Sequence, residues 1–461
     1  MSYYNDNAQD IQTTLNKTSR SFCAAKWTQV TIHLQNGFTH SCHHPAPHKI
    51  PLDELEKNPH ALHNTKHKIE QRKQMLEGIQ PNECNYCWNI ENLGKGDLSD
   101  RHYKSSEYWS SEYIDKILKN PLDDKFLPTY LEVSFSNACN LNCMYCSPQI
   151  SSKWQEDIRK NGPYDLGDFK HADLGWLESQ GMTPIPEKED NPYVNAFWKI
   201  WPELSQNLRV FRITGGEPLM SKHTWRILEY MQDNPNPDME ILINTNLCVQ
   251  DKLIDRLISI GKDLVENKKV KRFEIYTSIE SAGQQSEYIR PGLDYNQFIK
   301  NLMRVTTEIP MIKWRSKVVI MATYNLLSIP NFRLLLDWLI NYRKNHSSKE
   351  WKNIWLDISY LTYPSWQTVS LAPQEMLDII KHDLEYMKSN NQDHVGYWGF
   401  QDTEINKFER MYNHAINSNL SKDSIEYTRF YNFYKEHDKR KNFNFVKTFP
   451  ELEEFYNDCR P

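Results

Sequence analysis

Six segments of the chain combine β-branched and aromatic residues with partial alternation of apolar and polar positions, the pattern of β-strands. Four stretches between or after them carry apolar residues at three- and four-residue spacing, as amphipathic helices do, for example Leu334, Leu335, Trp338 and Leu339. The alternation of strands with helices predicts a parallel sheet. The predicted strands are 129–136, 208–214, 239–245, 270–279, 317–328 and 354–364, and the predicted helices are 221–234, 249–267, 294–308 and 329–344.

The segments on either side of this repeat have other patterns. Residues 28–34 and 38–42 flank Asn36-Gly37, which predicts a β-hairpin, and residues 51–80 have a helical pattern. Residues 160–192 are rich in Gly, Pro, Asp and Glu, which predicts a lid or substrate loop. After Pro373 the chain is charged, and we expect helices at 373–391, 402–418 and 423–440.

Composition narrows the class of protein. The 461 residues suit two to three domains, and 39% are apolar, which is enough for a sizeable core. No stretch reaches the ~20 apolar residues of a membrane helix, and the N-terminus lacks the pattern of a secretory signal, so we expect a cytoplasmic protein. The net charge, 55 − 60 = −5, has no basic excess and argues against nucleic-acid binding.

The nine cysteines fall into two groups and two single residues. An odd number without an export signal argues against a disulfide framework, and the clustering favours metal binding. The first group is Cys139, Cys143 and Cys146; the second is Cys23, Cys42, Cys84 and Cys87; Cys248 and Cys459 stand alone.

The first group has the spacing Cys-x3-Cys-x2-Cys and directly follows a predicted strand. Three thiolates within eight residues can bind three of the four irons of a cubane cluster. A closed structural zinc site needs a fourth protein ligand, and a simple [4Fe–4S] electron carrier needs four cysteines. The spacing therefore predicts a [4Fe–4S] cluster with one open iron.

This motif, with the aromatic Tyr145 before its third cysteine, resembles that of the radical S-adenosylmethionine (SAM) superfamily. The resemblance implies that SAM chelates the open iron, with Tyr145 near its adenine. It also implies that an electron from the cluster cleaves SAM to methionine and a 5′-deoxyadenosyl radical. The implied fold is α/β, a partial (β/α)6 TIM-type barrel whose chemistry lies at the C-terminal ends of the strands.

The resemblance extends to residues after the later strands. Gly215-Gly216-Glu217 matches the family's GGE motif: the glycines would let the backbone approach SAM, and Glu217 would accept from its ammonium group. Ser278 and Glu280 match residues that bind the SAM ribose. Arg290 resembles the arginine that meets the SAM carboxylate.

The second cysteine group resembles the SPASM or twitch modules that hold an auxiliary [4Fe–4S] cluster, although here the group is N-terminal. Three alternatives stay open. They are zinc held by four cysteines, a site that uses His43 or His44 in place of Cys23, and a cluster with an open iron that binds substrate. Cys248 is either a hydrogen-atom donor or a small buried hydrophobe. Cys459 is expected to have no role in the chemistry.

We therefore expect three domains: an auxiliary Fe–S domain over 1–127, the radical SAM partial barrel over 128–372, and a C-terminal helical extension over 373–461. The predicted function is radical SAM chemistry on a peptide or small-molecule substrate, with the second cluster aiding electron transfer. The expected partner is an electron donor such as flavodoxin or ferredoxin. The alternative is a zinc-stabilised binding protein, or a SAM-binding regulator without turnover.

Overall fold

The computed structural model describes residues 2–94, 98–348 and 351–461. The chain forms two compact units that do not follow chain order. The first comprises Met1–Ser136, Pro184–Gly215 and Asn236–Leu242, and the second comprises Asn137–Thr183, Gly216–Pro235 and Ile243–Pro461. The division into three domains stays a prediction.

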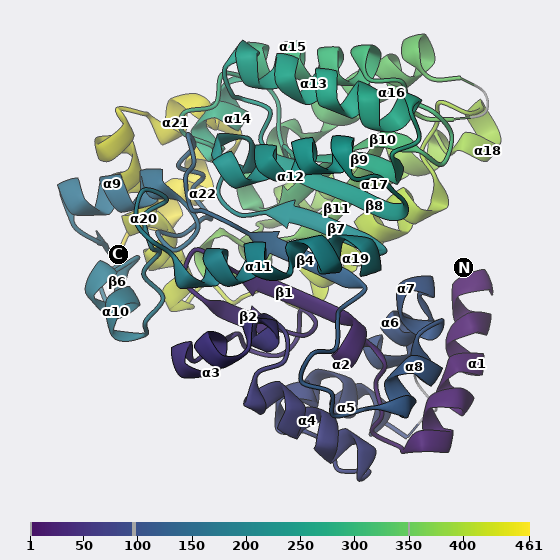
Figure 1. The fold of residues 1–461 in the computed structure, drawn as a ribbon. Coiled ribbons are helices and arrows are strands. Elements are labelled where there is room, and N and C mark those ends of the chain that lie inside the picture. Colours follow the sequence, from purple (N-terminus) through teal and green to yellow (C-terminus); the bar gives the residue numbers. More distant parts are fainter. Residues whose placement is uncertain (1, 95–97, 349–350) are drawn as a thin grey trace. The chain divides into compact units, whose positions relative to one another are not determined.

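In the first unit the predicted hairpin is present and joins a mixed sheet (Figure 1). Strands β1 (Gln29–His33) and β2 (Phe38–His40) are antiparallel, with Thr31 opposite His40. On its other side β1 runs parallel to β4 (Tyr130–Ser134), and β4 runs parallel to β7 (Val210–Thr214). β2 also pairs with the short β3 (His48–Lys49). The sequence predicted the hairpin, but not its pairing with β4.

The turn of this hairpin requires glycine. Gly37 has a φ of +70°, a left-handed conformation that side chains disfavour, and a Cβ there would lie 2.0 Å from the ring of Tyr193. Tyr193 belongs to α11 (Pro192–Asn207), a helix that the sequence analysis missed. Its signal was present, since Asn191 caps the helix and Pro192 occupies its first turn.

The other helices of the first unit range from 4 to 17 residues, and five of them contribute to an apolar cluster that contains Trp27, Trp88 and Phe126. Cys84 and Cys87 belong to the same cluster, so the predicted auxiliary site borders a hydrophobic core. These helices are α1 (Ser2–Thr18), α2 (Ala25–Thr28), α3 (Leu52–Lys57), α4 (Lys66–Leu76), α5 (Asn85–Glu91), α6 (Asp100–Ser106), α7 (Tyr108–Ser111) and α8 (Ile114–Lys119).

The second unit contains the parallel strands β9 (Val270–Ser278), β10 (Ser316–Tyr324) and β11 (Ile354–Tyr360). β8 (Asn236–Thr245) begins in the first unit and ends in the second. The predicted helices between these strands are present as α12 (Lys222–Asp233), α13 (Asp251–Glu266), α15 (Tyr295–Glu308) and α16 (Phe332–His346). The α/β class with a parallel sheet is confirmed, and the six-unit barrel stays a prediction.

One detail of the predicted helix faces is wrong. Leu334 is 52% exposed, whereas Leu335, Leu336 and Leu339 are buried. Four adjacent or nearly adjacent apolar positions cover more than one face of a helix, and packing decides which of them turns outward. Here Phe332 at the start of α16 is buried together with Leu335 and Leu339, and this stripe excludes Leu334.

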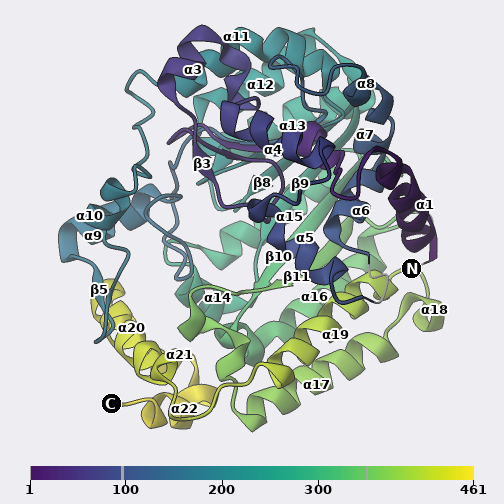
Figure 2. The same ribbon diagram turned by 90° about the horizontal axis from the view of Figure 1, so that it is seen from below.

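The C-terminal segment is helical, as predicted, and packs on the end of the sheet. α19 (Asp402–Asn417) contacts β11 and α17 (Gln374–Ser389) (Figure 2). A fully buried ion pair between Arg343 and Glu404 at 2.5 Å ties α19 to α16. The remaining helices are α14 (Gly283–Ile289), α18 (Gln392–Val395), α20 (Ile425–Lys441), α21 (Phe445–Thr448) and α22 (Glu453–Asp458).

The segment predicted as a lid contains short elements. It begins at the end of α9 (Ser152–Asn161) and contains the two-stranded pair β5 (Tyr164–Asp165) and β6 (Lys170–His171), then α10 (Leu174–Ser179). Within the described ranges, none of the helices has the length and apolar character needed to cross a bilayer.

The hairpin turn gives a test of packing in the first unit. Gly37→Ala should lower the free energy of unfolding by several kcal/mol, because the new methyl group meets the Tyr193 ring as well as the strain of a positive φ. Gly78→Ala is the matched control, since Gly78 has a φ of +78° and nothing within 4 Å. It should cost only about 1 kcal/mol. Urea unfolding midpoints compare the two, and equal losses would contradict the contact.

Candidate functional site

The three cysteines of the first group lie on one loop between β4 and α9, and the second unit holds this loop from several sides. The amide of Asn142 donates to Pro291 O and that of Met144 to Ile289 O, both at 2.9 Å. The indole of Trp154 donates to Cys143 O at 2.8 Å. Cys139 is buried, and Cys143 and Cys146 are half-buried. The loop is thus held by its backbone, which leaves the thiols available for metal.

Glycines let other segments approach this loop closely. A Cβ at Gly216 would lie 2.4 Å from Ala138 O, and a Cβ at Gly292, whose φ is +98°, would lie 2.9 Å from Asn140 O. The sequence predicts that the Gly-Gly pair lets the backbone approach SAM closely. The neighbour that excludes a side chain at Gly216 is the cysteine loop itself.

Glu217 is buried and already accepts three hydrogen bonds. Its donors are the amides of Leu219 at 3.0 Å and Asn246 at 2.7 Å and the hydroxyl of Thr245 at 2.8 Å. Burial raises the pKa of this carboxyl to about 7. Glu217 therefore ties the GGE turn to the end of β8. A carboxylate has about four acceptor sites, so one remains for a cation such as an ammonium group.

Glu280 and Arg290 form a buried ion pair beside the cysteines. The Nε of Arg290 donates to both Glu280 oxygens at 3.0 and 3.1 Å, and its Nη2 donates to Oε2 at 2.6 Å. Nη1 lies 3.6 Å from the sulfur of Cys143. Tyr145 completes the group, because its hydroxyl contacts Arg290 and donates to Glu280 at 3.1 Å.

Two of the predicted SAM contacts thus meet each other in this structure, and the positive charge of Arg290 faces a thiol. Ser278 lies at the end of β9, half-buried and two residues before Glu280. The described contacts do not bring the side chain of Ser278 to the Arg290 group, so its predicted role rests on its position alone.

Sequence reasoning missed Asn140, which links this loop to its neighbours. Its amide donates to Cys248 O at 2.6 Å and its oxygen accepts from Asn246 at 2.8 Å. Cys248 is half-buried, and its sulfur accepts from the amide of Asp294 at 3.3 Å. The only available signal for Asn140 was its position inside the cysteine motif.

Burial keeps the thiols of the loop protonated in the absence of metal. It raises the pKa of Cys139 to about 12 and also raises the pKa values of Cys143 and Cys146. The Arg290 guanidinium acts in the opposite direction on the pKa of Cys143. Metal binding here must therefore release protons, and Arg290 favours the thiolate.

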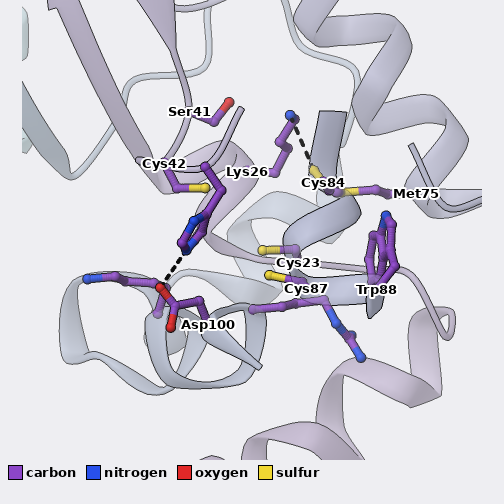
Figure 3. Close-up of a pocket in the computed structure, with 13 residues that line it drawn as sticks. Cys23, Lys26, Ser41, Cys42, Met75, Cys84, Cys87, Trp88 and Asp100 are labelled. Atoms are coloured by element: carbon purple, nitrogen blue, oxygen red, sulfur yellow. Dashed lines mark hydrogen bonds and ion pairs between the residues drawn. The ribbon is translucent and has the colours of Figure 1, made fainter. Parts of the chain in front are cut away.

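The four cysteines of the second group, all in the first unit, line one cavity (Figure 3). Cys23 precedes α2, Cys42 follows β2, Cys84 ends a 3-10 turn, and Cys87 lies in α5. Segments that are distant in sequence therefore bring four thiols to one place. This donor set fits a cluster that takes one thiolate at each of four irons.

Cations border the same cavity. Lys26, Arg101 and Lys104 line it against one carboxylate, Asp100. The Lys26 ammonium is paired with Glu83 and lies 3.9 Å from the sulfur of Cys84. Positive charge at this distance offsets the negative charge that thiolates bring to a metal cluster.

His44 also lines this cavity, and its Nε2 lies 2.7 Å from Asp100. A carboxylate on one nitrogen of a histidine is typical of a metal ligand, so the mixed-ligand alternative stays open. Among the residues that the structure describes, no group of three or more His, Cys, Asp or Glu is arranged to hold a single metal ion. A cluster differs because its thiolate ligands sit on separate irons.

A larger cavity, of about 690 Å³, borders Tyr145 and Cys146 in the second unit. Its walls come from the segment predicted as a lid and include Phe169, His171 and Trp176. Tyr363, which follows β11, contributes another aromatic ring. The cavity offers an apolar, aromatic surface next to the third cysteine of the loop.

No family model matches the chain. It is 20% identical over 259 residues to a GTP 3′,8-cyclase of Sulfurimonas denitrificans, a match that covers 56% of this chain and 64% of the relative. It is 26% identical over 174 residues to a mitochondrial GTP 3′,8-cyclase of Arabidopsis thaliana, with 36% of this chain and 35% of the relative covered. The matches thus span about one third to two thirds of these curated relatives.

The names of these relatives, together with the cysteine loop and the GGE turn described above, support a radical SAM superfamily member. Among solved structures, native anSMEcpe with bound AdoMet is 15% identical to this chain, and the match covers 55% of this chain and 58% of anSMEcpe with a TM-score of 0.30. Streptococcus suis SuiB is 13% identical to this chain, and the match covers 79% of this chain and 68% of SuiB with a TM-score of 0.32.

The ion pair of Arg290 and Glu280 beside the cysteine loop can be tested for its contribution to stability. Arg290→Gln should lower the free energy of unfolding by about 3 to 5 kcal/mol, because it leaves Glu280 buried without a counter-charge. Arg304→Gln, which breaks the more exposed pairs to Asp255 and Glu308, should cost about 1 kcal/mol or less. Urea unfolding measures both.

A double variant separates the pair from its parts. Arg290→Gln with Glu280→Gln removes both charges and should lose less stability than Arg290→Gln alone. If the double variant instead loses the sum of the two single losses, the two side chains are not coupled.

Glu217 predicts a pH dependence of stability in the metal-free protein. The pKa of its carboxyl is about 7 when folded and near 4.5 when unfolded, so the folded state binds more protons between these values. Stability from this group is therefore present below about pH 4.5 and decreases, by about 1 to 3 kcal/mol, as the pH rises to about 7. Glu217→Gln should flatten the profile of unfolding free energy in this range. A profile that is unchanged by the substitution would contradict the raised pKa.

Proposed function

We propose that this chain is an enzyme that reductively cleaves SAM and abstracts a hydrogen atom from a peptide or small-molecule substrate. Cys139, Cys143 and Cys146 would hold the SAM-binding [4Fe–4S] cluster. When bound, this cluster supplies one electron that splits SAM into methionine and a 5′-deoxyadenosyl radical. The observation that carries the proposal is the cysteine loop, which presents three thiols and no fourth, beside the buried Arg290–Glu280 pair.

The side chains around the loop support this chemistry in distinct ways. Arg290 places a guanidinium 3.6 Å from the Cys143 sulfur, where it favours the thiolate. Glu217 keeps one acceptor site for the SAM ammonium. Gly215 and Gly216 hold the GGE turn against the loop, and Tyr145, Ser278 and Glu280 are the remaining candidates for SAM contacts.

Arg290 has a second candidate partner in the SAM carboxylate. Its Nε and Nη2 are engaged by Glu280, so a bound carboxylate would share the guanidinium with Glu280 or compete with it. A ligand that draws Arg290 away would leave Glu280 free to accept from other donors, such as the ribose hydroxyls that the family resemblance assigns to it.

Cys23, Cys42, Cys84 and Cys87 would hold a second [4Fe–4S] cluster that takes up the electron left on the substrate after hydrogen abstraction. Four thiols around one cavity support full ligation of this cluster by the protein. Lys26, Arg101 and Lys104 at the same cavity would stabilise its more reduced state, because positive charge favours the form that carries an added electron.

The aromatic cavity beside Cys146 is our candidate for the substrate site. Its volume of about 690 Å³ suits one bulky residue of a peptide or a small molecule, and its lining favours an apolar group. The reductant would be a protein such as flavodoxin or ferredoxin, and we expect the reaction to take place in the cytoplasm.

Cysteine substitutions in the full-length protein test the proposal. After anaerobic reconstitution with iron and sulfide, the unsubstituted protein should form 5′-deoxyadenosine from SAM and dithionite. Cys143→Ala should abolish this product. Cys84→Ala should retain SAM cleavage but lose about half of the iron, because only the second cluster is lost. Chromatography of the nucleoside and iron analysis measure both effects.

Cys459→Ala is the matched control, since Cys459 belongs to neither group and should change neither measurement. Zinc in place of iron, or SAM binding without any 5′-deoxyadenosine, would overturn the proposal in favour of a binding protein or a regulator. Loss of cleavage in Cys84→Ala would mean that the two sites are not independent.

A further inference from the structure

A second large cavity of the second unit, of about 650 Å³, lies where α12 and α13 meet the cysteine loop. Residues of both helices line it, together with Leu219 and Met220 from the turn after Glu217. Asn140 from the cysteine loop and Cys248 also line it. The radical SAM chemistry described above assigns no role to this cavity.

The cavity is strongly basic in a chain whose net charge is −5. Lys222, Arg226, Lys252 and Arg256 line it against a single carboxylate, that of Glu229. Glu229 is paired with Arg256, whose guanidinium also lies 4.5 Å above the Trp225 ring. These four cationic side chains are exposed, and together with one carboxylate they give this surface a local positive potential.

Part of the lining of the cavity is next to the proposed cluster site. Asn140 is the residue directly after Cys139, and its side chain is bonded to Cys248 O and to Asn246. A partner that covers the cavity would therefore approach the cysteine loop through packed, hydrogen-bonded residues. At the cavity, Met220 is 41% exposed and offers an apolar contact among the charges.

We propose that this cavity is the docking surface for a small acidic protein that donates one electron to the cluster of Cys139, Cys143 and Cys146. The inference rests on the proposed function, which needs an external one-electron reductant. In the transfer, the reduced donor loses one electron and the cluster gains it, and no atom is exchanged. The lysines and arginines are complementary in charge to an acidic partner. Their position around an apolar contact is typical of protein interfaces, which have an apolar centre and a polar rim.

The proposal is tested by charge reversal in the full-length, reconstituted protein. The variant is Arg226→Glu with Lys252→Glu, and the matched control is Lys381→Glu with Arg410→Glu, on the exposed faces of α17 and α19. Both change the net charge equally. Reduced flavodoxin is the protein donor, and photoreduced 5-deazariboflavin is an uncharged small reductant that needs no docking surface.

We expect Arg226→Glu with Lys252→Glu to slow cluster reduction by flavodoxin about tenfold or more at low ionic strength, because steering by opposite charge is lost. The difference should shrink in high salt. Reduction by deazariboflavin and the subsequent formation of 5′-deoxyadenosine should match the unsubstituted protein. Stopped-flow absorbance measures the reduction rates.

Three results would overturn the docking surface. The first is an unchanged rate of cluster reduction by flavodoxin in Arg226→Glu with Lys252→Glu. The second is an equal slowing in the control variant. The third is that the four cationic residues bind only inorganic phosphate, and that this phosphate does not compete with flavodoxin. Failure of the proposed function is distinct, since the unsubstituted protein would then form no 5′-deoxyadenosine with either reductant.

Discussion

The buried pair of Arg290 and Glu280 is the interaction on which the candidate site depends. A guanidinium this far from water needs a counter-charge, and Glu280 supplies it through three short hydrogen bonds. The pair fixes the direction in which the remaining donor points, which is toward the sulfur of Cys143. The segment that follows Arg290 then reaches the cysteine loop, where Pro291 accepts from Asn142 and Gly292 passes close to Asn140. The ion pair of Arg290 and Glu280 and the position of the cysteine loop therefore depend on the same segment of the chain.

The same electrostatic problem is solved differently at the second group of cysteines. Four thiols gather at the edge of an apolar core in the first unit, where burial raises their pKa values. The nearby cations, Lys26 first among them, offset the charge that metal binding would create by releasing the thiol protons.

Prediction from sequence worked best where chemistry and pattern are local. The strands β4, β7, β9, β10 and β11 and the helices between the later ones follow from alternation and helical spacing, since burial of one face decides them. Prediction was wrong or incomplete where tertiary packing decides which residues of an element are buried and which strands pair. Leu334 is exposed although its neighbours are buried, and the pairing of the hairpin with β4 was not predicted. Helix α11 was also missed.

The sequence by itself determined the inventory of reactive groups: two sets of cysteines, a GGE turn after a strand, and an acid and an arginine further along. Spacing carries that information because a loop of eight residues can only present its thiols to one neighbourhood. Only the tertiary structure decided which of these residues contact each other. Glu280 and Arg290 pair with each other, Glu217 binds the end of β8, and Gly216 faces the cysteine loop. Such contacts join residues that are distant along the chain, and they are set by the packing of whole elements, which no local pattern records.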